Sequence, residues 1–152
     1  GGPLVDLNGN IVGINVALDQ TGSSIGFALP INDAKPVVKS VREIGRIVRP
    51  RLGLRYVMLT AQVAQDNKLP KSSGAWISPS TDGTPAVLPG SPADAAGLKE
   101  GDIITEINSI KLEGQTTLLS VVQKYKPGNK IGLKVFRNGK FIVLTATLDE
   151  FR

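Results

Sequence analysis

The chain has 152 residues and a net charge of +5, from 18 Lys and Arg against 13 Asp and Glu. It contains no His and no Cys, which excludes disulfides, His-ligated zinc and any Ser-His or Cys-His nucleophile built from these residues alone. No apolar run approaches the roughly 20 residues that a membrane helix needs, so we expect no membrane-spanning segment.

Residues 3–29 show the pattern of β-hairpins. Asn8–Gly9 stands between two apolar runs, which is the strongest short-range hairpin signal. A second turn is expected at residues 19–22. Pro30 should end the strand that follows, because proline cannot donate to a strand ladder.

A helix is expected after Pro30. Apolar residues recur near helical spacing from Val37 to Val48, and the opposite face carries cations. Asn32 is the expected N-cap, Gly45 the expected end, and residues 46–51 a linker.

Much of the positive charge gathers between residues 35 and 55, where Glu43 is the only acidic residue. The cations are Lys35, Lys39, Arg42, Arg46, Arg49, Arg51 and Arg55. Nucleic-acid sites interleave such cations with aromatics or provide a reading helix, and only Tyr56 comes near. We interpret the stretch as a solvated helix face and linker and expect no nucleic-acid partner. An acidic protein surface or anionic lipid stays open.

From Leu52 the pattern changes to short strands alternating with short helices. Strands are expected at residues 54–59, 75–77, 103–107, 131–136 and 141–148, and helices at residues 60–67, 91–97 and 116–125. The sequence therefore predicts an α+β fold that is mostly β, in two parts, residues 1–49 and 50–152. The first part has too few residues to bury a sufficient core, so we expect it to be a remnant of a larger domain.

Residues 1–30 carry the first resemblance. Gly1–Val5, Gly13–Asn15 and Gly26–Pro30 resemble the end of the protease domain in the HtrA (DegP-like) serine proteases, a trypsin-like β-barrel family. The family's nucleophile lies in a Gly-Asn-Ser-Gly-Gly motif, which would place the serine immediately before Gly1 and the His and Asp further upstream. A serine needs that base and an oxyanion hole, so no catalytic residue is expected in residues 1–152.

The same resemblance implies a remnant of the substrate pocket. It would place Asn15, Val16, Ala17 and Leu18 alongside the substrate. A half-buried strand without any substrate role would show the same pattern.

No other catalytic set stands out. No spacing singles out a Ser/Lys pair, and Asp82-Gly83-Thr84 only permutes the aspartic-protease loop. The carboxylates near residues 94–106 are better explained as cap, turn and strand-surface residues. We therefore expect no cofactor and no metal.

Residues 51–54, Arg-Leu-Gly-Leu, resemble the carboxylate-binding loop of PDZ domains. Glycine lets successive backbone N–H groups point one way and form an anion-binding nest, and the peptide then adds a strand to the edge that begins at Leu54. The triplet alone is a weak signal. Residues 89–104, however, match the PDZ segment of the HtrA family nearly throughout. Asn108–Ser109 departs from the family's usual Asn-Gly, which affects only the turn type.

The resemblance implies a peptide groove between this strand and the helix that follows Thr116. The two-residue period puts Leu54, Tyr56 and Met58 on one side of the strand. The expected peptide-binding residues are Arg51, Leu52, Gly53, Leu54, Tyr56, Met58, Leu118, Leu119 and Val122. One of the three helix residues is expected to belong to the core, and Arg51 or Arg55 to attract the carboxylate only weakly.

We expect the chain to bind peptide C-termini or unfolded polypeptides, as the C-terminal part of an HtrA-like serine endopeptidase, and to be inactive alone. One alternative is a part of an active envelope quality-control protease when the N-terminal portion is present. Another is an assembly module that associates through exposed strand edges or swapping. The resemblance implies a bacterial envelope or periplasmic location, although these residues encode no address.

Overall fold

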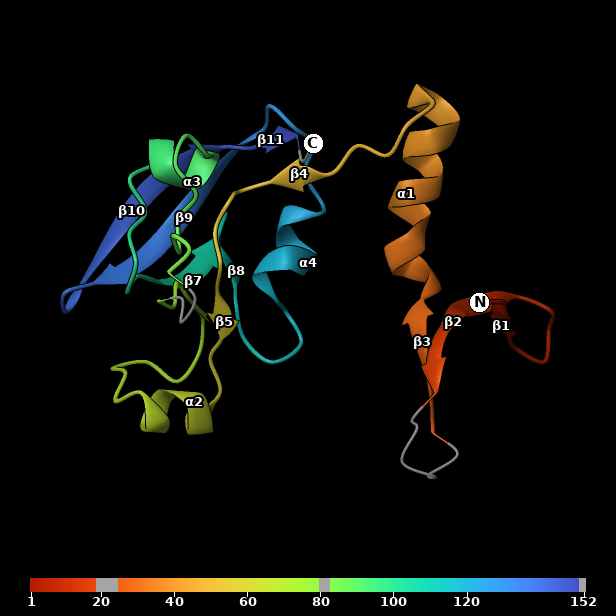
Figure 1. Cartoon of the computed structure of the whole chain (residues 1–152), viewed down its shortest axis with the longest axis horizontal. Helices are drawn as coiled ribbons and strands as arrows, with labels where there is room; N and C mark the ends of the chain where they lie inside the picture. The colour runs from red at the N-terminus through yellow and green to blue at the C-terminus, as the bar shows by residue number, and fades with distance from the viewer. Residues whose placement is uncertain (19–24, 80–82, 151–152) are drawn as a thin grey trace. The chain divides into compact units, whose positions relative to one another are not determined.

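The computed structural model describes residues 1–18, 25–79 and 83–150. The chain divides into two compact units, Gly1–Val48 and Arg49–Arg152 (Figure 1). Strands and short helices alternate, which confirms the predicted α+β class. The turn predicted at residues 19–22 lies outside the described residues.

The first unit contains a three-stranded antiparallel sheet in the order β1-β2-β3. Its strands are β1 (Pro3–Val5), β2 (Ile11–Leu18) and β3 (Gly26–Pro30). Between β1 and β2, the Asp6 carboxylate accepts hydrogen bonds from the Asn10 side chain and from the backbone N–H groups of Asn10 and Asn8. These bonds, that of the Asn10 side chain first, lower the pKa of Asp6. The predicted turn is therefore held by local polar contacts.

Helix α1 (Ile31–Ile44) follows β3 directly. It begins one residue before the predicted N-cap, so that assignment was wrong: Asn32 lies inside the helix and its side-chain oxygen accepts from the Lys35 ammonium at 2.9 Å. Gly45 ends the helix as predicted, with a left-handed φ of 78° and its N–H donated to the Val41 carbonyl.

The first unit has no apolar core among its described residues, of which only Gly13 is buried. Phe27, for example, is 58% exposed in β3. This unit by itself therefore leaves most of its apolar surface in contact with water. Removal of such surface from water is what drives folding.

The second unit is built on a six-stranded antiparallel sheet in the order β10-β9-β7-β6-β5, with β8 paired to β7. The strands are β5 (Val57–Met58), β6 (Ala75–Trp76), β7 (Ile103–Ile107), β8 (Ile110–Lys111), β9 (Lys130–Arg137) and β10 (Lys140–Thr147). A separate pair joins β4 (Pro50–Arg51) to β11 (Asp149–Glu150). The last two residues of the predicted linker, residues 50–51, therefore form a strand. No local pattern indicates this, because the partner strand lies at the far end of the chain.

Each short helix among the described residues of this unit begins at a side-chain cap. Thr60 caps α2 (Ala61–Asp66), Ser91 caps α3 (Pro92–Ala95) and Thr117 caps α4 (Leu118–Val122). Each cap oxygen accepts a backbone N–H three residues on, which satisfies a donor with no partner inside the helix.

The core of the second unit combines side chains of the sheet with those of α3 and α4. Its largest fully buried apolar side chains are Ile77, Ile103, Ile104, Ile107, Leu112, Val121, Ile131, Leu133, Val135 and Leu148. Asp102 is buried with them, and Arg137 compensates its charge through two hydrogen bonds of 2.7 Å. Those hydrogen bonds raise the pKa of Arg137, which keeps the guanidinium charged.

Candidate peptide-binding site

The candidate site begins at the loop from Leu52 to Leu54, whose carbonyl groups are held by residues 88–93. The Leu52 carbonyl accepts the Ala93 N–H at 2.8 Å. The Gly53 carbonyl accepts the Leu88 N–H at 3.0 Å and the Ser91 hydroxyl at 3.0 Å. Both carbonyls therefore point toward the segment 88–93.

The direction of these carbonyls fixes the direction of two N–H groups. In a trans peptide the C=O of one residue and the N–H of the next point opposite ways. The N–H groups of Gly53 and Leu54 must therefore point away from residues 88–93. Successive N–H groups arranged in this way form an anion-binding nest.

Glycine at position 53 is required by backbone conformation and by space. Its φ is 80°, in the left-handed region that side chains disfavour. A Cβ there would lie 2.4 Å from the Ser91 Cβ, closer than atoms approach. Ser91 is buried and also caps α3. One serine therefore links the loop to the helix that supports it.

The strand after the loop turns one polar edge away from the sheet. Leu54 is paired with Val87 in an isolated antiparallel bridge. The flanking bonds, Arg55 N–H to the Ala86 carbonyl and Leu88 N–H to the Gly53 carbonyl, make Leu54 and Val87 a non-hydrogen-bonded pair. The N–H and C=O of Leu54 thus point to the opposite edge, and alternation along extended backbone gives Tyr56 the same direction.

Side chains along this strand alternate as predicted. Leu54, Tyr56 and Met58 are half-buried and pack against the core, whereas Arg55 and Val57 are exposed. The Tyr56 hydroxyl accepts the backbone N–H of Leu119 at 3.2 Å, in the first turn of α4. This bond places α4 beside the segment between β4 and β5 (Figure 1).

The three helix residues predicted for the groove separate into two groups. Leu118 and Val122 are 4% and 3% exposed and belong to the core, whereas Leu119 is 53% exposed. Leu118 and Val122 can therefore form only the base of a site, and Leu119 its rim. The sequence anticipated one core residue among the three predicted for the groove, whereas α4 directs both Leu118 and Val122 inward, together with Val121.

Arg51 is engaged elsewhere. Its guanidinium forms two hydrogen bonds, of 3.0 and 2.7 Å, with the Asp149 carboxylate. That pairing raises the pKa of Arg51 and neutralises the charge that the sequence offered to a peptide carboxylate. Sequence reasoning missed Ser91 as part of the site. Its signal was Ser-Pro-Ala-Asp, which predicts a capped helix but not a bond to a glycine 38 residues away.

The predicted substrate-pocket residues lie in β2. Asn15, Val16 and Ala17 are exposed, and Val16 is the extra residue of a bulge between the pairs that Asn15 and Ala17 make with β3. The side chain of Leu18, at the end of β2, is outside the described residues. β-bulges re-aim side chains and are frequent near active sites, but no catalytic group lies beside this one in the described residues of the first unit.

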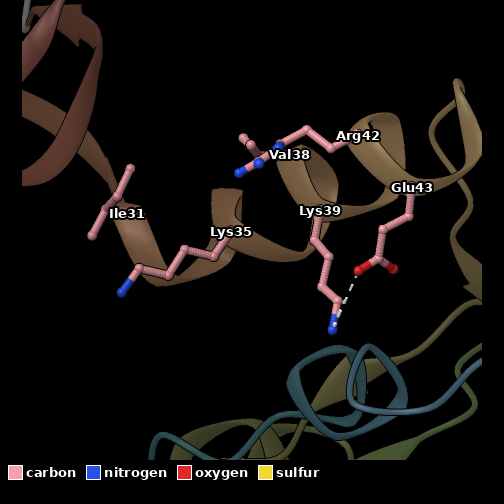
Figure 2. Close-up of a pocket in the computed structure, with 6 residues that line it drawn as sticks. All are labelled: Ile31, Lys35, Val38, Lys39, Arg42 and Glu43. Carbon is pink, nitrogen blue, oxygen red and sulfur yellow. Dashed lines mark ion pairs between the residues drawn. The ribbon is translucent and has the colours of Figure 1, made fainter.

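A pocket lies against one face of α1 (Figure 2). It is lined by Ile31, Lys35, Val38, Lys39, Arg42 and Glu43. Its ion pair, Lys39 with Glu43 at 3.8 Å, is exposed. A single helix face cannot converge polar groups on a ligand, so we assign no site there. In the described ranges, no three metal-binding side chains cluster.

Comparison with known proteins agrees with this geometry. Residues 50–148 match the family model described as PDZ domain. The chain is 38% identical over 152 residues to the periplasmic pH-dependent serine endoprotease DegQ of Escherichia coli, covering 98% of this chain and 32% of DegQ. It is 35% identical over 153 residues to the periplasmic serine endoprotease DegP of Salmonella typhimurium, covering 99% and 31%. The chain thus spans about a third of these relatives.

Two solved structures show the same relationship in three dimensions. The HtrA-type protease AlgW with decapeptide has a TM-score of 0.76 at 32% identity, covering all of this chain and 46% of that one. AlgW with tripeptide has a TM-score of 0.74 at 33% identity, covering 100% and 49%.

The relatives also bear on location. DegQ and DegP are both named as periplasmic, which supports the predicted envelope location by family resemblance. In the part of the chain that the structure describes, no helix has the length and apolar character to span a membrane. The chain belongs to the PDZ domain family and is homologous over its whole length to the HtrA-type serine proteases.

Proposed function

We propose that the second unit binds the C-terminal end of a peptide. The terminal carboxylate is bound by the N–H groups of Gly53 and Leu54, and the peptide continues as an antiparallel strand along the edge from Leu54 to Met58. The observation that carries this proposal is the pair of carbonyls, of Leu52 and Gly53, tied to residues 88–93. PDZ domains bind peptides by strand addition, and the AlgW structures with bound peptides support the same use here.

Each predicted residue has a part in this proposal. Leu54, Tyr56 and Met58 provide the apolar strand side, Leu119 the exposed rim, and Leu118 and Val122 the buried support. Arg51 fixes the start of the domain to its end through Asp149 and contributes little to attraction of the peptide.

The test is a titration of the whole chain with two peptides that end in apolar residues and differ only in a C-terminal carboxylate or amide. Hydrogen bonds to a charged group are worth more than neutral ones, so the acid should bind at least about tenfold more tightly. Fluorescence anisotropy measures both dissociation constants. Equal affinity for acid and amide contradicts the proposal.

We further propose that the first unit is the end of a trypsin-like protease domain, and that the whole protein is an envelope serine endopeptidase in which PDZ capture delivers or gates unfolded substrates. The homology over both units supports this. Because residues 1–152 contain no His, they should leave unfolded casein uncleaved. Cleavage that survives repurification, at constant specific activity, would contradict the assignment.

A second candidate function is assembly. β1 and β3 are the edges of their sheet, and apolar side chains such as Phe27 are exposed on it. Strand edges and apolar surface of this kind favour pairing between chains. Light scattering of the chain distinguishes this role from that of a monomeric binding unit.

A further inference from the structure

The sheet of the second unit ends at β10 on the side opposite the proposed peptide strand. Its order, β10-β9-β7-β6-β5, puts β5 at one end and β10 at the other (Figure 1). β10 pairs with β9 along its whole length without a bulge, and its sequence contains neither proline nor glycine. A regular edge strand of this kind presents backbone groups with which another chain can pair.

The register decides which backbone groups of β10 point away from the sheet. A tight turn joins β9 to β10, so Arg137 and Lys140 form a hydrogen-bonded pair, and such pairs recur at every second residue. Phe141, Val143 and Thr145 therefore occupy non-hydrogen-bonded positions, and their N–H and C=O groups point outward. Among the described residues, no other segment forms backbone hydrogen bonds with these groups.

The two faces of β10 differ in burial. Ile142 and Leu144 are half-buried and pack against the core, whereas Phe141 and Val143 are 49% and 75% exposed. A strand added to this edge continues both faces, because directly opposite side chains lie on the same face. Every second residue of an added strand should therefore be apolar, so that it covers Ile142 and Leu144.

Lysines lie beside the exposed face of β10. The Lys71 ammonium is 4.8 and 4.9 Å from the ring centroids of Phe136 and Phe141, which pack edge to face. Lys134 lies directly opposite Val143, and its ammonium is 5.3 Å from the Phe141 centroid. Ammonium groups are attracted to the faces of aromatic rings. The two rings thereby hold two positive charges next to the free edge.

This charge decides between the possible occupants of the edge. Lys130 adds a third cation to the same face of β9, and Glu106 offsets one through its ion pair of 2.8 Å with Lys134. A second copy of the chain would double the positive charge, and lysines beside a sheet edge are a common device against pairing between copies. A segment that carries carboxylates on this face would be attracted instead.

We propose that β10 binds an extended polypeptide segment in which acidic and apolar residues alternate, by adding it to the sheet as a strand. The acidic side chains lie on the face of Lys71 and Lys134, and the apolar ones cover Ile142 and Leu144. Backbone hydrogen bonds supply affinity and the alternating side chains supply selection. No terminal carboxylate is needed, so this site is independent of the loop at Gly53.

The first test uses the whole chain and a peptide in which Glu and Val alternate. The peptide carries a fluorophore at its N-terminus and an amide at its C-terminus, so it offers no terminal carboxylate to the loop. Two controls keep its length: one has Glu and Val in separate blocks, and the other has Lys in place of Glu. By fluorescence anisotropy the alternating acidic peptide should bind at least about tenfold more tightly than either control, and added salt should weaken it. Equal affinity for it and either control overturns the inference.

The second test removes one donor from the free edge. Val143→Pro loses an N–H that points away from β9, and an edge strand tolerates proline in that orientation. It should weaken binding of the alternating acidic peptide about tenfold. Val143→Thr is the matched control, because it keeps the N–H and a β-branched side chain, and it should change affinity by less than about threefold. Unchanged binding by Val143→Pro overturns the inference.

Hydrogen exchange in the wild-type chain decides the question even if circular dichroism shows that Val143→Pro does not fold. The peptide should slow exchange of the Phe141, Val143 and Thr145 amides at least about tenfold, and unchanged rates overturn the inference.

Two further outcomes would assign a different occupant or site. If a free-acid apolar peptide displaces the alternating peptide, both bind at the loop and β10 is not a separate site. If light scattering gives Val143→Pro a lower mass than the wild type, a second copy of the chain occupies β10. Either result overturns the inference, whereas no displacement and an equal mass support it.

Discussion

At the scale of single residues, the proposal that the loop binds a carboxylate rests on Gly53 and Ser91. The positive φ of Gly53 reverses the backbone, and Ser91 holds the Gly53 carbonyl on one side. Either residue could be replaced without changing the charge of the molecule. For each variant, the free energy of unfolding and the affinity for the peptide can therefore be measured separately.

Gly53→Ala should be clearly more destabilising than Gly90→Ala. Both glycines have positive φ, but only at Gly53 would a Cβ meet another atom, at 2.4 Å, whereas at Gly90 the space is open. Strain alone costs about 1–2 kcal/mol, so Gly53→Ala should exceed that cost in the free energy of unfolding. Urea denaturation measures both variants. Equal losses in the free energy of unfolding would show that the contact with Ser91 adds nothing to the cost of Gly53→Ala.

Ser91→Ala should lose stability and affinity together. It removes the cap of α3 and the bond to the Gly53 carbonyl, for a loss of about 1–2 kcal/mol in stability. Thr60→Ala is the control, because it removes the cap of α2 but no loop contact. The control should be destabilised yet bind the free-acid peptide as the wild type does. If Ser91→Ala also binds normally, the serine does not position the loop.

At the scale of elements, the pair formed by Asp102 and Arg137 joins the turn before β7 to β9. The Asp102 side chain is only 2% exposed, and Arg137 also donates to the Gly97 carbonyl. The turn additionally donates the Lys99 N–H to the Asp102 carboxylate. This arrangement fixes the exit of α3 relative to the sheet.

Arg137→Met should therefore cost about 3 kcal/mol of unfolding free energy, because it leaves a buried carboxylate without its cation. Lys134→Met removes a cation from the more exposed pair with Glu106 and should cost less than about 1 kcal/mol. Guanidinium chloride denaturation compares the two. Similar losses would contradict the assigned importance of the buried pair.

The helix caps could be predicted from the sequence, whereas pairings between distant segments could not. Caps at Thr60 and Ser91 were predictable because the chemistry spans three residues. The strand expected at residues 54–59 is shorter, a bridge at Leu54 followed by β5, because its pairing depends on partners far along the chain. The pair of β4 and β11 was missed, since Arg51 and Asp149 are 98 residues apart. Nor does any local pattern predict the bond from Leu119 to Tyr56.

At the scale of the whole molecule, the two units differ in how they are stabilised. The second has a core around Ile104 and Leu133, whereas the described residues of the first leave apolar side chains such as Phe27 and Leu29 exposed. Removal of apolar surface from water is the main drive to fold. The second unit should therefore be independently stable and the first should not.

A fragment of residues 49–152 should unfold cooperatively and remain monomeric, whereas residues 1–152 should self-associate or bind a hydrophobic dye. Light scattering and dye fluorescence measure these properties. Phe27→Ser in the longer chain should reduce both signals, because it removes exposed apolar surface. A monomeric longer chain that binds no dye would show that the first unit buries its surface by itself.

Nuclear magnetic resonance directly observes the two backbone amides, of Gly53 and Leu54, that are proposed to bind the carboxylate. Titration of the ¹⁵N-labelled chain with the free-acid peptide should move the amide proton resonances of Gly53 and Leu54 downfield, because each donates to a carboxylate. The amide-ended peptide should leave both nearly unchanged. If these two resonances stay in place while the acid peptide binds, the carboxylate is held elsewhere and the account is wrong.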